Sequence, residues 1–253
     1  MATVIAVTNQ KGGVGKTTSA VNIAYFLAKA GKTTLLIDFD PQGNATSGLG
    51  VEKQQLEGTM SEVLTGKSNL QDVVLPTKHK NLSLAPATPH LANSEVELAQ
   101  AEHRFTRLKT AIATLEDYDF IIIDSPPSLS LLTVNGLIAA NYVLLPVQAE
   151  FYALEGLGQL LETMKLVRKN MNPELDLLGV LPTMMDSRTT LSNQVLEEIK
   201  KHFPGKVFDH PIPRNIRLAE APSHGVPVGA YDRFSKGSRA YKAVAKEVLE
   251  RVG

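Results

Sequence analysis

The most informative stretch of the chain reads Lys11-Gly12-Gly13-Val14-Gly15-Lys16-Thr17-Thr18. It follows a short β-branched apolar run, residues 3–8, which predicts a buried strand. It leads into residues 16–30, where apolar side chains recur at helical spacing. Glycines let backbone N–H groups turn toward phosphate oxygens, and the N-terminus of a helix adds its dipole. The sequence therefore predicts a phosphate-binding loop between a strand and a helix.

The side chains of this loop suit a nucleoside triphosphate. Lys16 is placed to reach the β- and γ-phosphates, and the Thr17 hydroxyl is placed to bind Mg²⁺. The standard pattern G-x-x-x-x-G-K-[ST] requires glycine at position 10, where this chain has Gln10. An ordinary glycine-rich turn is the alternative interpretation, and the flanking strand and helix favour phosphate binding over it.

Two further apolar runs end in acidic residues. Residues 33–38 end at Asp38, with Asp40 two positions later, and residues 120–124 end at Asp124. Carboxylates beside a phosphate loop suit Mg²⁺ and the positioning of an attacking water molecule. A solvated turn and a capping aspartate are the alternatives, and the neighbouring phosphate loop makes them the weaker interpretations.

Strands and helices alternate along the rest of the chain. Further strands are predicted at residues 81–85, 142–147, 175–181 and 207–212. Helices are predicted at residues 95–115, 154–170, 191–202 and 236–252. Because no linker or repeat interrupts this order, we expect one α/β domain over residues 1–253. Its sheet should be mostly parallel, with helices on both faces, as in P-loop NTPases.

Composition excludes several classes of protein. The 253 residues include no cysteine, which removes disulfide scaffolds, zinc–thiolate sites and thiolate-held iron–sulfur clusters. Lys plus Arg equals Asp plus Glu, at 26 each, so bulk charge does not favour nucleic acid or membrane binding. No apolar run is long enough to span a membrane, and the start has no basic leader. A cytoplasmic protein is the expectation.

At family level, Lys11 to Thr17 resembles the deviant Walker A motif of the ParA/MinD ATPases, in which an additional lysine precedes the glycines. Residues 36–46, 124–128 and 212–223 resemble the ParA/Soj chromosome-partition ATPases most closely. The resemblance implies slow, partner-stimulated hydrolysis of ATP with Mg²⁺ and a homodimer around two ATP molecules. It also implies non-specific binding to double-stranded DNA, a ParB/Spo0J-type partner and a location at the nucleoid.

The same resemblance implies roles for individual residues. Lys11 would cross the dimer interface to the partner's phosphates, and Gly12 would leave room for that approach. Asp40 would position the hydrolytic water, and Asp38 and Asp124 would lie at the Mg²⁺ site with Thr17. The remaining nucleotide-binding positions would be Gly13, Val14, Gly15, Lys16 and Thr18 at the phosphates, and Pro213 and Asn215 near the adenine.

Several basic residues toward the C-terminus are candidates for DNA binding. Arg188 and Arg217 resemble DNA-contacting residues of the family, and Lys200 and Lys201 are further candidates. The alternative is ordinary: lysines at a helix end complement its dipole, and isolated surface arginines are common. A dimer could still gather separate basic patches onto one surface, so we expect DNA binding.

Other functions of the same fold remain as alternatives. A synthetase that phosphorylates a carboxylate would need a substrate pocket in place of the dimer interface, and Lys11 argues against it. A MinD-like division-site regulator would end in a basic membrane-binding helix, but the last helix mixes charges, so no stable membrane binding is expected. A ParA-like ATPase that positions a plasmid or a protein cargo is not separated from a chromosome-partitioning one. No N-terminal helix-turn-helix extension is expected.

Overall fold

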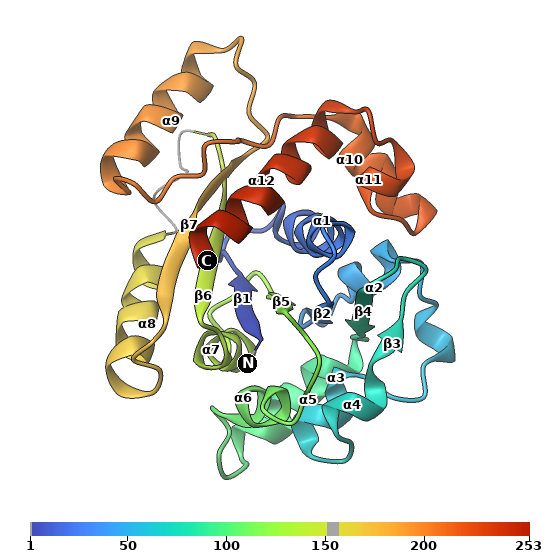
Figure 1. Cartoon of the computed structure of the whole chain (residues 1–253). Coiled ribbons are helices and arrows are strands. Elements are labelled where there is room, and N and C mark those ends of the chain that lie inside the picture. Colours follow the sequence, from blue (N-terminus) through green and yellow to red (C-terminus); the bar gives the residue numbers. More distant parts are fainter. Residues whose placement is uncertain (1, 151–156) are drawn as a thin grey trace.

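A central β-sheet organises the computed structural model, which describes residues 2–150 and 157–253. Within those residues, seven strands form one sheet in the order β3-β4-β2-β5-β1-β6-β7 (Figure 1). All neighbouring pairs are parallel except β3 with β4. The strands are β1 (Thr3–Val7), β2 (Thr34–Asp38), β3 (Leu75–Pro76), β4 (Leu82–Ala85), β5 (Phe120–Asp124), β6 (Tyr142–Gln148) and β7 (Asp176–Thr183).

Helices cover both faces of this sheet, as the sequence predicted (Figure 1). One face packs against α1 (Lys16–Lys29) and α12 (Lys236–Val252), and the other against α7 (Leu131–Ala139). The remaining longer helices are α5 (His90–Ala99), α8 (Leu157–Asn170) and α9 (Thr190–His202). The short ones are α2 (Asn44–Gly48), α3 (Met60–Thr65), α4 (Leu70–Val73), α6 (Arg107–Ile112), α10 (Ile216–Glu220) and α11 (Val228–Tyr231).

Each strand divides its apolar side chains between two cores. In β1, Val4 and Ala6 belong to the core beneath α7, whereas Ile5 and Val7 belong to the core beneath α1 and α12. This is the period of two that a strand buried on both faces requires. The helices of the described residues are too short or too polar to cross a bilayer.

The predicted helix over residues 95–115 is wrong. The structure has two helices there, α5 and α6, and His103 between them adopts a left-handed conformation with φ 61°. The buried side chain of Asn135 accepts from the Leu108 N–H at 3.3 Å and donates to the Arg104 carbonyl at 2.8 Å. This side chain from α7 replaces the helical hydrogen bonds that the break removes.

The predicted strand over residues 207–212 is also wrong as a regular element. Residues 207–213 run beside β7 but form only isolated bridges, Val180 with Val207 and Met185 with Pro213. Pro211 and Pro213 have no N–H to donate, and neither does Pro182 on β7, so the ladder has gaps. The other predicted elements are present near their expected bounds; residues 154–156 of the predicted helix 154–170 lie outside the described residues. Sequence reasoning missed β3, α7 and the short helices.

Gly179 of β7 offers a test of this packing. A Cβ atom there would lie 2.5 Å from the Lys206 carbonyl oxygen and 2.9 Å from the Phe208 ring. We expect Gly179→Ala to lower the free energy of unfolding by about 1–3 kcal/mol, because the backbone beside β7 must move. Urea unfolding measures it.

The matched control is Gly158→Ala in helix α8, where an added Cβ would meet nothing within 4 Å. That variant should be neutral or more stable by about 0.5–1 kcal/mol, since alanine is the better helix former. Equal unfolding midpoints for Gly179→Ala and the wild type would show that residues 206–208 are not packed closely against β7.

Candidate nucleotide-binding site

The predicted phosphate loop joins β1 to α1. Gly13 and Gly15 have φ angles of 76° and 87°, in the left-handed region that favours glycine. Gly15 occupies the N-cap position of α1, so the helix begins at Lys16 without a capping side chain. The free N–H groups of this helix end point into the loop, which suits an anion.

The loop is held in place by two neighbouring strands. The Thr183 hydroxyl, at the end of β7, donates to the Val14 carbonyl at 2.8 Å. The Asn9 amide donates to the Pro146 carbonyl at 2.7 Å, and its oxygen accepts from the Lys11 N–H at 3.0 Å. Contacts with β6 and β7 therefore fix the shape of the loop.

The two lysines of the loop have different surroundings. Lys16 is only 7% exposed, and its ammonium donates to the Lys11 carbonyl at 3.0 Å. Burial lowers the pKa of Lys16, and the charges of Asp124 and Asp40 act in the opposite direction. The side chain of Lys11 is 41% exposed, and its Nζ lies 3.5 Å from a carboxylate oxygen of Glu150. One lysine thus lies inside the phosphate site and the other on its rim.

Asp38 and Asp124 are both fully buried at the carboxyl edge of the sheet, where they are register partners on β2 and β5. Asp38 accepts hydrogen bonds of 2.7 Å from the N–H and hydroxyl of Thr46. Burial nevertheless raises the pKa of Asp38 to about 6. Burial, and next the charge of Asp38, raises the pKa of Asp124.

Neither carboxylate oxygen of Asp124 accepts a hydrogen bond of good geometry within the described part of the chain, although the Thr17 hydroxyl lies close enough to act against the rise in its pKa. A buried carboxylate without partners is unfavourable unless a cation balances it. The hard oxygen atoms of Asp124, with the Thr17 hydroxyl at the start of α1, are the donors that Mg²⁺ prefers. These residues therefore fit a magnesium ion.

Asp40 lies just beyond β2 and is 6% exposed. Its carboxylate accepts from the Gln42 N–H at 2.9 Å, and its charge acts on Lys16. The sequence prediction placed Asp38, Asp40 and Asp124 beside the phosphate loop, and the structure brings them together there.

A cavity of about 290 Å³ lies beside the loop. Gly15 and Thr18 form one side of it, and Pro213 and Asn215 form another, so predicted phosphate-end and base-end residues share one space. The Asn215 side-chain oxygen is buried and has no partner among the described residues. It is available to accept a hydrogen bond from a ligand such as an adenine amino group. Tyr241 of α12 also lines the cavity.

None of the predicted DNA-binding residues lines this cavity. Arg188 precedes α9, Lys200 and Lys201 lie at its C-terminal end, and Arg217 lies in α10. Each has an acidic partner. The shortest distances are 2.7 Å for Arg188–Asp186, 2.9 Å for Lys200–Glu197, 2.6 Å for Lys201–Glu198 and 2.8 Å for Arg217–Glu220.

Sequence reasoning missed several residues that shape the site. Thr46 holds Asp38, Thr183 holds the phosphate loop, and Glu150 pairs with Lys11. Thr46 is the last residue of the stretch 36–46 that resembles the ParA/Soj ATPases. Its place in that stretch, eight residues after Asp38, could have indicated a role at the site. Thr183, the last residue of β7, and Glu150, two residues after β6, belong to no distinctive sequence pattern.

Comparisons with known proteins agree with this geometry. A family model described as an AAA domain matches residues 2–177. The sporulation initiation inhibitor protein Soj of Bacillus subtilis is 53% identical over 249 residues, which cover 98% of both chains. The chromosome partitioning protein ParA of Myxococcus xanthus is 49% identical, over 98% of this chain and 88% of that protein.

A similar solved structure is described as a cobyrinic acid a,c-diamide synthase from Mycobacterium smegmatis with bound ADP and magnesium. It is 40% identical with a TM-score of 0.88, over 100% of this chain and 96% of that one. Its bound ADP and magnesium agree with the phosphate loop and buried carboxylates described above. From the full-length identity to Soj and ParA, the chain belongs to the Soj/ParA family of chromosome-partitioning ATPases.

Proposed function

We propose that this ATPase, which uses ATP with Mg²⁺, works as a DNA-bound switch that partitions a chromosome or plasmid. ATP binding pairs two copies of the chain, and the dimer binds double-stranded DNA without sequence preference at the nucleoid. A ParB/Spo0J-type partner then stimulates slow hydrolysis and returns the protein to monomers. The names of the relatives support the partitioning role.

The contrast between the two loop lysines carries the proposal. Lys16 already fills the phosphate site of its own chain, so Lys11 on the rim is available for a different set of phosphates. A second copy facing the loop would bring its own γ-phosphate within reach of Lys11. Positive charge there would stabilise the negative charge that develops during transfer. ATP would thus bind the dimer better than the monomers.

The other residues divide the remaining tasks. Gly12 leaves the approach to the loop open: a Cβ there would meet nothing within 4 Å in this chain. Lys16 and the backbone of residues 13–18 hold the phosphates, and Asp40 orients the attacking water. Mg²⁺, held near Thr17, Asp38 and Asp124, supplies charge that neutralises the phosphate oxygens. Pro213 and Asn215 contact the adenine.

Three rival functions predict different behaviour. A synthetase, as the description of the Mycobacterium smegmatis structure suggests for that protein, would consume ATP only with a carboxylate substrate and would act without pairing. A regulator that positions a protein cargo, or a MinD-like one at the division site, would share the ATP-driven dimer but use another partner or surface. Dimerisation therefore distinguishes the proposed switch from a synthetase, and DNA binding distinguishes it from a MinD-like regulator.

The division between binding and chemistry is tested by Lys16→Ala and Asp40→Ala. Lys16→Ala should abolish ATP binding, because it removes the buried charge from the phosphate site. Asp40→Ala should bind ATP with wild-type affinity and hydrolyse it about 100-fold more slowly, because only the water loses its orientation. Calorimetry measures affinity, and phosphate release measures the rate. Equal loss of binding in both variants would contradict this assignment.

Dimerisation is tested by sedimentation in the Asp40→Ala background, which retains ATP. With ATP and Mg²⁺ this variant should sediment as a dimer, and with ADP as a monomer. Adding Lys11→Ala should return the ATP form to a monomer while ATP still binds, because Lys16 is unchanged. A stable ATP-bound dimer without the Lys11 ammonium would remove the cross-interface role.

DNA binding is tested by Arg217→Glu with Lys80→Glu as the control. Lys80 is an exposed lysine in the turn before β4, so Lys80→Glu makes the same charge change at a residue outside the predicted DNA contacts. The wild-type protein with ATP should shift two unrelated duplexes equally, and its affinity should fall steeply with salt as counterions are released. Arg217→Glu should weaken both complexes about tenfold or more, because it removes phosphate contacts.

Lys80→Glu should leave the mobility shift unchanged, and both variants should keep wild-type ATPase activity without DNA. Equal binding in ADP and ATP would remove the switch from the mechanism. An unaltered shift with Arg217→Glu would leave Arg188, Lys200 and Lys201 as the DNA contacts.

A further inference from the structure

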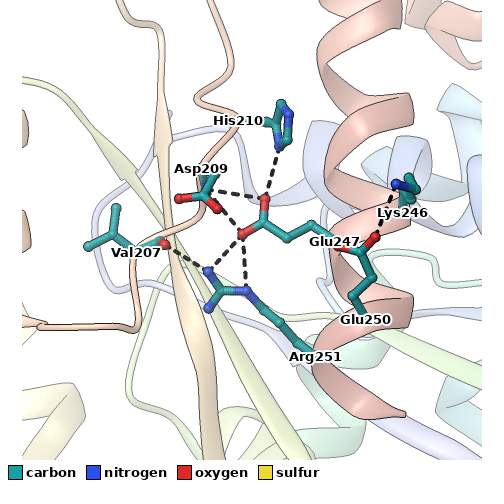
Figure 2. Close-up of polar contacts among 7 residues, drawn as sticks. All are labelled: Val207, Asp209, His210, Lys246, Glu247, Glu250 and Arg251. Atoms are coloured by element: carbon teal, nitrogen blue, oxygen red, sulfur yellow. Dashed lines mark hydrogen bonds and ion pairs between the residues drawn. The ribbon is translucent and has the colours of Figure 1, made fainter.

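A buried ion pair ties the C-terminal helix to the segment beside β7. The side chains of Glu247 and Arg251, one turn apart on α12, are 8% and 19% exposed. Arg251 donates to Glu247 through Nε at 3.0 Å and Nη2 at 2.7 Å. Figure 2 shows both side chains pointing from the helix toward the chain at Val207 and Asp209.

Both members of the pair also bind the neighbouring backbone. Arg251 donates to the carbonyl of Val207 at 2.7 Å and to that of Leu178, on β7, at 3.0 Å. Its guanidinium lies 4.3 Å from the centre of the Phe208 ring. The arginine therefore joins α12, β7 and the segment in one contact.

Glu247 holds the next residues of that segment. Its two carboxylate oxygens accept from the Asp209 N–H at 3.1 and 3.2 Å, and one of them lies 3.1 Å from Nδ1 of His210 (Figure 2). Phe208 and Ile212 donate to carbonyls of β7 at 2.9 and 2.8 Å, and Glu247 supplies the acceptor for the Asp209 N–H between them.

The held segment leads directly to the cavity beside the phosphate loop. Pro211 and Pro213 have fixed φ angles, which makes the chain from His210 to Asn215 stiff. Arg214, between Pro213 and Asn215, donates to the Met185 carbonyl at 3.0 Å, and Pro213 and Asn215 line the cavity. The stretch between residue 209 and the cavity is therefore short and held at both ends. Tyr241, on the same helix, lines it too and has its hydroxyl 3.0 Å from that of Ser19 in α1.

We propose that Glu247 and Arg251 are positioning residues for the base end of the nucleotide site. Glu247 and Arg251 do not touch the nucleotide themselves. They hold residues 207–210 in place, so that Pro213 and Asn215 contact the base. The inference rests on the proposed base-contacting role of Asn215. It assigns the last turns of α12 a part in nucleotide affinity and none in the chemical step.

The test compares Glu247→Gln with Glu250→Gln on the same helix. Glu250 forms an exposed pair with Lys246 at 3.1 Å and does not reach the segment in Figure 2. Glu247→Gln should weaken ADP binding, measured by calorimetry, and raise the KM for ATP by about fivefold or more. Its kcat at saturating ATP should stay within about twofold of wild type. Glu250→Gln should change none of these values.

If Glu247 only stabilised the fold, the effects of Glu247→Gln on KM and kcat would be reversed. Partial unfolding would reduce the amount of active protein, which lowers the apparent kcat and leaves KM unchanged. Arg251→Lys serves as a second variant, because lysine keeps a charge beside Glu247 and loses the two-carbonyl contact. It should also raise KM. An unchanged KM and ADP affinity in folded Glu247→Gln and Arg251→Lys would overturn the inference.

Asn215→Ala separates this inference from the proposed function. If Asn215→Ala leaves ADP affinity unchanged, the base-contacting role of Asn215 is wrong, and the inference fails with it. If Asn215→Ala weakens ADP binding while Glu247→Gln does not, the base site stands and the positioning role alone is wrong. Weakening by both, with the double variant no worse than Asn215→Ala, is the expected result.

Discussion

The pairing of β5 with β1 and β2 is the constraint on which the site depends. It places Asp38 directly opposite Asp124, and both are fully buried; the charge of Asp124 also acts on the ammonium of Lys16. Burial raises the pKa of both carboxyls, so their ionised forms are unfavourable in a region from which water is excluded. Such an arrangement opposes folding, and a cation that binds there relieves it. The apolar cores on both faces of the sheet must supply the compensating stability.

The nucleotide site is assembled from parts that are far apart in the sequence. The phosphate loop follows the first strand, the acidic residues come from the ends of β2 and β5, and residues 213–215 supply the proposed base end. β7 connects these parts, because Thr183 holds the loop and the neighbouring carbonyls hold the segment before Asn215. The C-terminal helix completes the arrangement from outside the sheet. If the proposed positioning role holds, a change in this helix alters the site without touching a nucleotide-binding residue.

Much of this arrangement could be predicted from local sequence. The phosphate loop, the strand ends at Asp38 and Asp124, and the parallel sheet follow from motif and periodicity within single segments. The errors arise where a distant side chain decides the local structure. Asn135 provides hydrogen bonds to a break at residues 100–106, and the Glu247–Arg251 pair holds a segment that reads as a strand. Neither effect leaves a pattern in the segment that it shapes.

The ion pairs of the basic surface residues affect how the proposed DNA binding responds to ATP-driven pairing of two subunits. Hydrogen bonds from Arg188 lower the pKa of Asp186 to about 2, so physiological acidity cannot free this guanidinium. In the proposed DNA complex, a phosphate must replace the carboxylate partner of each basic side chain. Each such replacement contributes little net free energy of binding. Only many simultaneous exchanges exceed the entropy lost on association. The fraction of protein bound to DNA would then show a threshold. It would be close to zero for single subunits and would rise abruptly once two subunits present their cations together.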